Sequence, residues 1–283
     1  MKFIYILQTC FLLLFTIAGF AQKGVLGDVT VSVQNEWVNT YTTLTLNANA
    51  GATSISVASN TLSGAYFSTN LVPGDLILII QMQGAAVDIN TTPTASWGGA
   101  YTVQNSWIAG TNPNWDETEY GQVLNYNNAG NYEYVEVSGV TGGTIINLNC
   151  ALTKSYTASG RVQVIRVPRF NNLTIQNNSS ISCPQWTGST GGVVAIEVAG
   201  DLNLDGTGQI EANEKGFRGG VKDNQTSYNA STGPQGFLGS FDIVEGSEKG
   251  EGIGGFYTEY DNLFSRYCNG AVANGGGGGN FHN

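Results

Sequence analysis

The residues with the most specific spacing in the chain follow the pattern of a calcium-binding loop. Asp201, Asn203 and Asp205 alternate with leucines, and Gly206 follows them. Alternate oxygens of this kind can surround one ion, and the glycine allows the sharp turn that such a loop needs. The twelfth position is Ala212, however, where such loops have a bidentate glutamate. Calcium is therefore the one candidate cofactor, and the alternative is that this segment is a polar corner of a repeat.

A second group of candidate residues consists of aromatic side chains in the long segment 85–121. Trp97, Trp107, Trp115 and Tyr120 could stack on sugar rings, because aromatic faces bury C–H surfaces while nearby polar groups bind hydroxyls. These four residues are candidate glycan ligands. The alternative is that they anchor a long loop to its domain.

Three acids in the same segment could act on a glycosidic bond. Asp116, Glu117 and Glu119 are close in sequence, whereas glycosidases hold two carboxyl groups ~5 Å or ~6.5–9.5 Å apart, usually from different elements. A solvated acidic loop is the favoured interpretation. The single histidine, His282, excludes histidine-based catalysis from most of the chain. We assign no catalytic residue, and the pattern leans away from an enzyme.

Cysteines add one candidate covalent link. Cys150, Cys183 and Cys268 follow the N-terminal segment, so at most one disulfide can form among them. Cys150 and Cys183 are the candidate pair. The alternative is that both are small buried residues.

Composition excludes several classes of partner. The chain has 283 residues, 39 glycines, 11 basic and 21 acidic residues, and a net charge of −10. Nucleic-acid binding needs a basic stripe, and anionic lipid also attracts basic segments, so neither partner is expected. With 41% hydrophobic and 11% aromatic residues, global disorder is excluded as well. Extracellular glycans or surfaces are the expected partners.

Residues 1–21 have the pattern of a secretion signal. Lys2 provides the positive start, residues 11–17 the apolar centre, and residues 18–21 the small-residue cleavage pattern before Gln22. The apolar run is short for a membrane span of ~20 residues. We therefore expect contact with a secretion machinery, cleavage, no membrane insertion afterwards, and a location outside the cell or on its outer surface.

The elements that must position all these residues are strands. Apolar residues recur with a period of two, and residues 76–80 form a continuous apolar run after the turn at 72–75, which is typical of a strand buried on both faces. We predict an all-β protein. Residues 22–168 form a β-sandwich or barrel-like domain, and residues 169–283 form a second region.

The second region contains an internal repeat with an offset of 29 residues. Residues 172–183 align without gaps on residues 201–212, and both copies read apolar-x-apolar, a polar turn, and a further apolar residue. The matched positions are Leu173 and Leu202, Ile175 and Leu204, and Ile181 and Ile210. Such a repeat predicts a parallel β-solenoid in which the matched residues stack. The alternative is two hairpins of one antiparallel sheet.

The chain closes in a glycine-rich segment that ends with residues 275–279. Glycine pays a large backbone entropy cost on ordering, and no cap or strand end accompanies this segment. We expect the sequence to be the N-terminal portion of a longer protein.

Six short motifs are spread along the chain. They are Phe20-Ala21-Gln22, residues 74–84 (GDLILIIQMQG), Tyr120-Gly121, residues 127–133 (NNAGNYE), residues 186–192 (WTGSTGG) and residues 216–220 (GFRGG). Together they resemble the N-terminal region of large secreted cell-surface proteins of the Bacteroidota. Many of those proteins end in a gliding-motility-associated or type IX secretion sorting domain and are described as adhesin-like. The resemblance implies a surface protein and names no reaction.

Two functions from different classes follow from these observations. The first is a non-catalytic, secreted cell-surface protein of structural or adhesin-like type, which contacts surfaces or glycans through exposed loops. The alternative is a secreted polysaccharide-active enzyme or carbohydrate-binding module, suggested by the tryptophan-rich segment beside acids.

Overall fold

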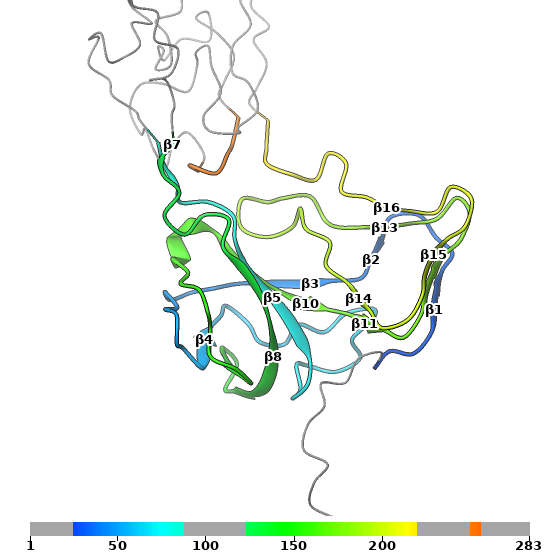
Figure 1. The fold of residues 1–283 in the computed structure, drawn as a ribbon, viewed down its shortest axis with the longest axis horizontal. Coiled ribbons are helices and arrows are strands. Elements are labelled where there is room, and N and C mark those ends of the chain that lie inside the picture. The colour runs from blue at the N-terminus through cyan, green and yellow to red at the C-terminus, as the bar shows by residue number, and fades with distance from the viewer. Residues whose placement is uncertain (1–24, 88–122, 220–249, 256–283) are drawn as a thin grey trace, which may run out of the picture.

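The computed structural model describes residues 25–87, 123–219 and 250–255. Apart from one 3-10 turn, η3 at Ala158–Gly160, every regular element in these ranges is a strand (Figure 1). The all-β prediction is therefore confirmed. The strands are β1 Val29–Val31, β2 Glu36–Trp37, β3 Thr40–Thr43, β4 Ser54–Ser56, β5 Leu76–Gln81, β6 Ala86–Val87, β7 Val123–Asn125, β8 Tyr132–Thr141, β9 Ile145–Leu148, β10 Val162–Val167, β11 Arg169–Phe170, β12 Leu173–Ile175, β13 Ser180–Ser182, β14 Glu197–Val198, β15 Leu202–Leu204 and β16 Gln209–Ile210.

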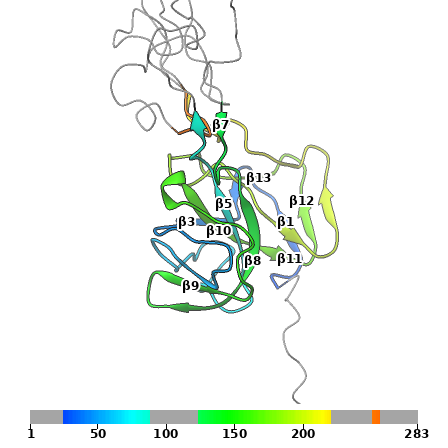
Figure 2. The ribbon, with the colours of Figure 1, turned by 60° about the vertical axis from the view of Figure 1, so that its left-hand side comes forward.

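One part of the molecule is a curled antiparallel sheet, which we call the half-barrel. Its six strands run in the order β3-β10-β5-β8-β9-β4, and they wrap around a common interior (Figure 2). The interior is filled by buried aliphatic side chains and by Tyr156, which is 1% exposed. The barrel-like form of the first domain thus arises from a single sheet.

Strand β5 shows why the sequence carries a continuous apolar run. It pairs with β10 on one side and β8 on the other, so it has a neighbour at both edges. Ile77 and Ile79 belong to the cluster inside the half-barrel, whereas Leu76 and Leu78 belong to a second cluster on the outer face. Both faces are covered, and the predicted doubly buried strand is confirmed.

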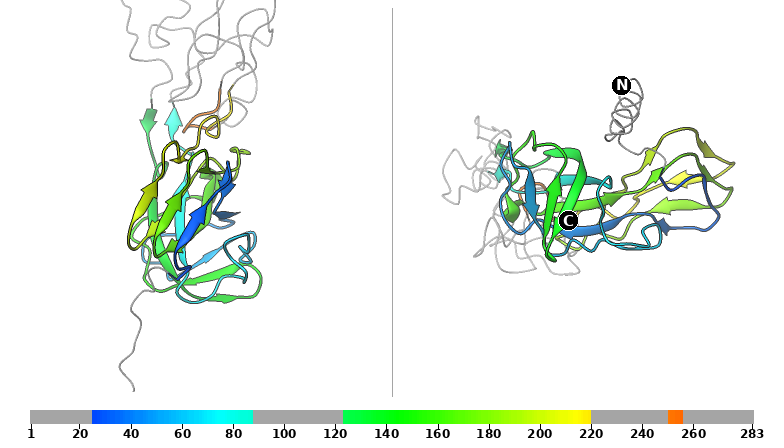
Figure 3. Two further views of the ribbon diagram at one scale, coloured as in Figure 1. Left: turned by 90° about the vertical axis from the view of Figure 1, so that its right-hand side faces the viewer. Right: turned by 90° about the horizontal axis from the view of Figure 1, so that it is seen from below.

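The other part of the molecule consists of three parallel ladders, β1-β12-β15, β2-β13-β16 and β11-β14. The strands of the first ladder lie side by side in Figure 3. The register sets Leu173 opposite Leu202 and Ile181 opposite Ile210. The 29-residue offset therefore reports real strand pairing, and the antiparallel alternative is wrong for these strands.

The first strands of the chain belong to the ladders. Val29 pairs with Leu173 and Trp37 pairs with Ser182, so the strand pairing crosses the division that the sequence places after residue 168. Because β1 and β2 supply a neighbour for β12 and β13, residues 172–183 are enclosed on both sides. Leu173, Ile175 and Ile181 are each 0% exposed.

The half-barrel and the ladders share a packed interface. Strand β10 runs on through Pro168 into β11, and the segment before β14 returns across the outer face of β5 and β10. The buried side chain of Asn39 links the two: Nδ2 donates to Arg166 O at 3.0 Å and to Ala195 O at 2.6 Å, and Oδ1 accepts from Ala195 N at 3.0 Å. The two parts form one continuous body.

Candidate functional site

The end of the half-barrel at which β5 ends and β10 begins carries a polar cavity of about 630 Å³. Among the described residues, its lining contains amide side chains, hydroxyl side chains and glycine backbone, and no charged or aliphatic residue. The lining residues are Gln81, Gly84, Asn125, Asn127, Asn128, Thr157, Ser159 and Gly160. A cavity of this kind offers hydrogen bonds in both directions and no net charge.

The floor of this cavity is held rigidly by Gln81. Its Oε1 accepts from Thr157 N at 2.8 Å, and its Nε2 donates to Gln83 O at 2.8 Å. Gly160 lies directly against it, because a Cβ on Gly160 would be 2.2 Å from Gln81 Nε2. The glycine is therefore required by close packing, and the floor cannot shift without loss of these bonds.

The wall of the cavity comes from the turn between β7 and β8. Asn127 has a φ of 50°, a left-handed conformation that asparagine tolerates. Its backbone N–H donates to Asn125 Oδ1 at 2.7 Å, and its Nδ2 donates to Gly84 O at 2.8 Å. Asn128 Nδ2 donates to Thr157 Oγ1 at 3.0 Å. The three amides are oriented before any ligand arrives.

The tryptophan-rich segment begins and ends at this cavity. Ala86 of β6 pairs with Asn125 of β7, and Val87 pairs with Val123, so the chain leaves and returns at one short ladder. The predicted glycan ligands themselves lie outside the described residues, as do the three acids of the same segment. These residues are Trp97, Trp107, Trp115, Tyr120, Asp116, Glu117 and Glu119.

Exposed tyrosines near the cavity were missed by the sequence analysis. Tyr126 is 60% exposed and lies between the two lining residues Asn125 and Asn127. Tyr132 and Tyr134 of β8 are 56% and 51% exposed. The motif NNAGNYE at 127–133 predicts a turn, but a turn sequence does not indicate whether the flanking rings of Tyr126 and Tyr134 face solvent.

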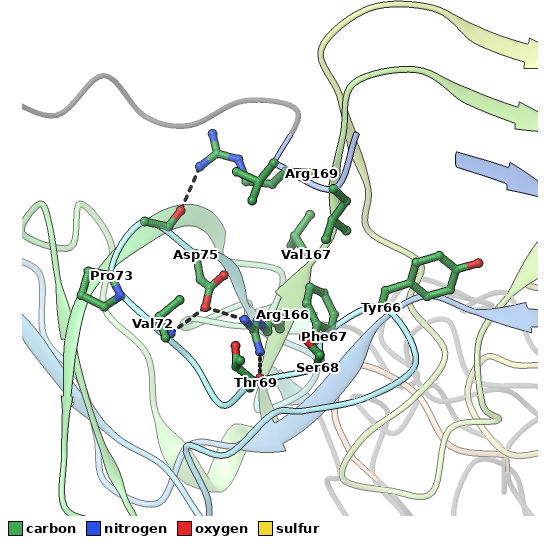
Figure 4. Close-up of a pocket in the computed structure, with 13 residues that line it drawn as sticks. Tyr66, Phe67, Ser68, Thr69, Val72, Pro73, Asp75, Arg166, Val167 and Arg169 are labelled. Carbon is green, nitrogen blue, oxygen red and sulfur yellow. Dashed lines mark hydrogen bonds and ion pairs between the residues drawn. The ribbon is translucent and has the colours of Figure 1, made fainter. Parts of the chain in front are cut away.

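A second cavity of about 220 Å³ lies between the half-barrel and the ladders (Figure 4). Arg166, 3% exposed, donates from Nη2 to Asp75 Oδ2 at 2.7 Å and from Nη1 to Thr69 O at 2.7 Å. Its guanidinium carbon lies 4.3 Å from the centre of the Phe67 ring, a cation–π contact. This arginine is committed to the packing of the half-barrel.

Arg169 forms the second ion-pair centre of this cavity. It pairs with Glu197 of β14 through Nε and with Glu136 of β8 through Nη1 at 2.8 Å, and Nη1 also donates to Gly74 O at 3.1 Å. Burial alone would lower the pKa of Arg169, but its hydrogen bonds to the carboxylates of Glu197 and Glu136, together with their charges, raise it. The residue therefore joins two ladder strands to the half-barrel, a structural role.

Several of the sequence motifs meet at Glu251, which is 1% exposed. Gln83 Nε2 donates to Glu251 Oε1 at 2.9 Å, and Arg218 Nε donates to Oε2 at 2.8 Å. Arg218 also lies against Gly188, where a Cβ would be 2.7 Å from Nη2. Burial alone would raise the pKa of Glu251, but hydrogen bonds, chiefly from Arg218, lower it. The motifs at 74–84 and 186–192 and the described residues 216–219 of the third motif are thus parts of one packed joint.

The calcium-loop residues lie along an edge strand. Asp201, Asn203 and Asp205 are exposed, and the backbone between them is the extended strand β15. Alternate residues of a strand point to one face at intervals of ~6.6 Å, whereas a calcium ion takes six to eight oxygens around it, so three side chains along one edge do not enclose the ion. Within the described residues, no group of three histidine, cysteine or acidic side chains could hold a metal ion. The alternative, a polar corner of the repeat, describes this segment.

The candidate disulfide is not formed. Cys150 is exposed after β9, and Cys183 is buried at the end of β13; both thiols are free. Burial raises the pKa of Cys183. The alternative of a small buried residue describes Cys183 but not Cys150, which is exposed because β9 ends at Leu148, two residues before it. Cys268 lies outside the described residues.

Comparisons with known proteins give limited similarity. No protein-family model and no curated protein matches the chain. Among solved structures, the tailspike gp61 of Pseudomonas phage phi297 is 13% identical with a TM-score of 0.25, over 67% of this chain and 24% of that chain. The Gp54 tailspike of Acinetobacter baumannii bacteriophage AP22, solved in complex with A. baumannii capsular saccharide, is 16% identical with a TM-score of 0.26, over 65% and 26%. The tailspike gp49 of Pseudomonas phage LKA1 is 14% identical with a TM-score of 0.23, over 56% and 22%.

This chain therefore spans about a quarter of the length of those tailspike chains. Within the described ranges, no helix has the length and apolar character needed to cross a bilayer.

Proposed function

We propose that this chain is the N-terminal part of an exported, non-catalytic cell-surface protein of the adhesin-like type found in Bacteroidota. Its parallel ladders begin a β-solenoid, and its loops contact glycans or other surfaces. The signal pattern of residues 1–21 and the six sequence motifs support export through a dedicated secretion machinery. The glycine-rich joint around Glu251 supports a scaffold role, because those motifs pack backbone closely against backbone there.

The observation that carries this proposal is the solvent exposure of apolar side chains on the last ladder strands, β15 and β16. Leu202 and Leu204 are 45% and 50% exposed and Ile210 is 37% exposed, although each is stacked on a fully buried partner. An edge strand with apolar residues in register is a template for a further strand. This arrangement supports a solenoid that continues by adding coils with the same spacing.

The proposal is tested in a strain that lacks the gene. Antibody labelling or protease treatment of intact cells should detect the protein on the outer surface of the parent strain. The deletion strain should adhere less to glycan-coated surfaces, and the full-length gene should restore adhesion. Unchanged adhesion together with an intracellular location would overturn the proposal.

A carbohydrate-binding module is the second candidate, because the uncharged polar cavity lies at the base of the tryptophan-rich segment. A polysaccharide-active enzyme would release reducing ends or unsaturated products from a polysaccharide, whereas a binding module would retain the polysaccharide unchanged. Incubation of the purified chain with a panel of polysaccharides separates these outcomes.

A further inference from the structure

We propose that the cavity at the end of the half-barrel is a binding site for neutral carbohydrate, with Asn125, Asn127, Thr157 and Ser159 as hydrogen-bonding groups. The inference deepens the proposed function, because it names the ligand class and the residues through which the protein contacts glycans. It is carried by the described residues of the cavity alone.

Two amide side chains of the cavity keep hydrogen-bonding groups that no described residue occupies. Asn125 uses Oδ1 to accept from Asn127 N, and Asn127 uses Nδ2 to donate to Gly84 O. Within the described part of the chain, Asn125 Nδ2 and Asn127 Oδ1 have no hydrogen-bond partner. The pair therefore presents one donor and one acceptor from neighbouring positions of one turn, which is what a sugar hydroxyl needs, since it both accepts and donates.

Two hydroxyl side chains also line the cavity, Thr157 just before η3 and Ser159 within η3. Thr157 Oγ1 accepts from Asn128 Nδ2, so its own proton points elsewhere. Ser159 also lines the cavity, and its hydroxyl makes no hydrogen bond to any described residue. Together with the asparagines, these groups surround the space with donors and acceptors already oriented. Binding then costs little side-chain ordering.

The described lining residues carry no charge, and this favours neutral ligands over charged ones. Among the described residues that line the cavity, none has an acidic or basic side chain. The nearby acid Glu133 is occupied, because its carboxylate accepts from Thr153 N at 2.9 Å, Thr153 Oγ1 at 2.8 Å and Lys154 N at 3.2 Å. Phosphorylated, sulfated or uronic ligands need cationic partners, which the described lining residues do not supply. Apolar ligands need aliphatic walls, which these residues also do not supply.

An exposed aromatic residue is the sequence neighbour of both lining asparagines. Tyr126 lies between the two lining asparagines and is 60% exposed. An exposed ring beside oriented amides is suited to stacking on the C–H face of a sugar, with the hydroxyls turned toward the amides. The cavity volume of about 630 Å³ falls in the range of small-molecule sites.

The test uses the purified exported chain and a set of neutral oligosaccharides, namely cellohexaose, mannohexaose and maltoheptaose, together with neutral polysaccharides in affinity gels. Oligogalacturonate and a sulfated glycan are the charged counterparts. We expect binding of at least one neutral glycan, at least tenfold weaker binding by Asn127→Ala and Tyr126→Ala, and no preference for the charged probes. Tyr134→Ala is the matched control, since this tyrosine is similarly exposed but lies within β8 opposite Leu78, whereas Tyr126 lies between two lining residues.

Three outcomes overturn the proposal: no neutral glycan binds, the cavity variants bind as tightly as the parent, or the charged probes are preferred. Circular dichroism and thermal unfolding verify that each variant is folded, and Ser159→Ala provides a second, milder cavity variant. The result is separable from the proposed function. Normal glycan binding by the cavity variants, combined with poor adhesion of the deletion strain, would remove this site and leave the surface role intact.

Discussion

Two copies of one repeat occupy different environments in this molecule. Residues 172–183 and 201–212 share their apolar spacing, and their strands pair in register. Leu173 is 0% exposed, whereas its partner Leu202 is 45% exposed. The difference arises because β12 lies between β1 and β15, while β15 has β12 as its one neighbour in the described ladder. A repeat pattern therefore determines how strands align, and burial depends on how many neighbours each copy has.

The largest expected effect comes from truncating the buried copy. Leu173→Ala removes a side chain that is enclosed on both sides and should lower the free energy of unfolding by about 2–5 kcal/mol. Leu202→Ala, the matched substitution in the edge copy, should cost less than half as much, because part of its surface already contacts solvent. Urea unfolding followed by circular dichroism measures both, and equal losses would mean that both copies are enclosed.

A smaller effect is expected at the ion pairs of Arg169, which lie just before each copy and join β11 and β14 to β8 of the half-barrel. Arg169→Met leaves Glu197 and Glu136 without their shared cation, and those carboxylates are 26% and 18% exposed. Solvent screening reduces the penalty below that of a fully buried pair. We expect a loss of about 2 kcal/mol, and the double variant with Glu197→Gln should recover part of it. An additive double variant would contradict this coupling.

The pH dependence of stability should differ between the two edges of the ladder β1-β12-β15, because Asp28, just before β1, accepts several hydrogen bonds. Asp28 accepts from Asn171 Nδ2 at 2.7 Å, from Asn172 Nδ2 at 2.9 Å and from Asn172 N at 3.2 Å, and these amide hydrogen bonds lower its pKa below 3.8. Because the pKa of Asp28 is lower in the folded than in the unfolded chain, its carboxylate stabilises the fold at pH values above the unfolded-state pKa. This contribution is lost as the pH falls through the folded-state pKa.

Asp28→Asn should therefore flatten the dependence of Tm on pH below about 4, relative to the parent chain. Asp201→Asn is the matched control at the equivalent position of the edge copy, where Asp201 N donates to Asn172 Oδ1 at 2.8 Å. The same flattening in both variants would contradict a role specific to Asp28.

The smallest effect is expected from calcium. The extended backbone of β15 separates Asp201, Asn203 and Asp205 along an edge strand, so millimolar calcium or EDTA should change Tm by less than about 1 °C. Calorimetric titration gives an independent readout. A rise of several degrees that is abolished by Asp205→Ala would restore the calcium-loop interpretation.

The sequence analysis predicted much of the fold and little of the candidate site. Period-two alternation located β1, β4 and β9, and the continuous run at 76–80 located the central strand of the half-barrel. The sequence did not indicate that Cys150 is exposed, because the end of β9 at Leu148 has no local signal. Tyr126 and Ser159 were not singled out, since a polar turn has the same composition whether its side chains face a cavity or open solvent.

The sequence by itself determined the strand content, the 29-residue register and the absence of a basic surface, because side-chain periodicity and charge are local properties. Only the tertiary structure decided that β1 and β2 pair with strands more than 140 residues away, as Val29 does with Leu173 and Trp37 with Ser182. It also decided that Glu251 is buried against Gln83 and Arg218, and that amides from one turn face hydroxyls from another. Such contacts depend on which distant segments the folded chain brings together, and short-range spacing carries no record of that choice.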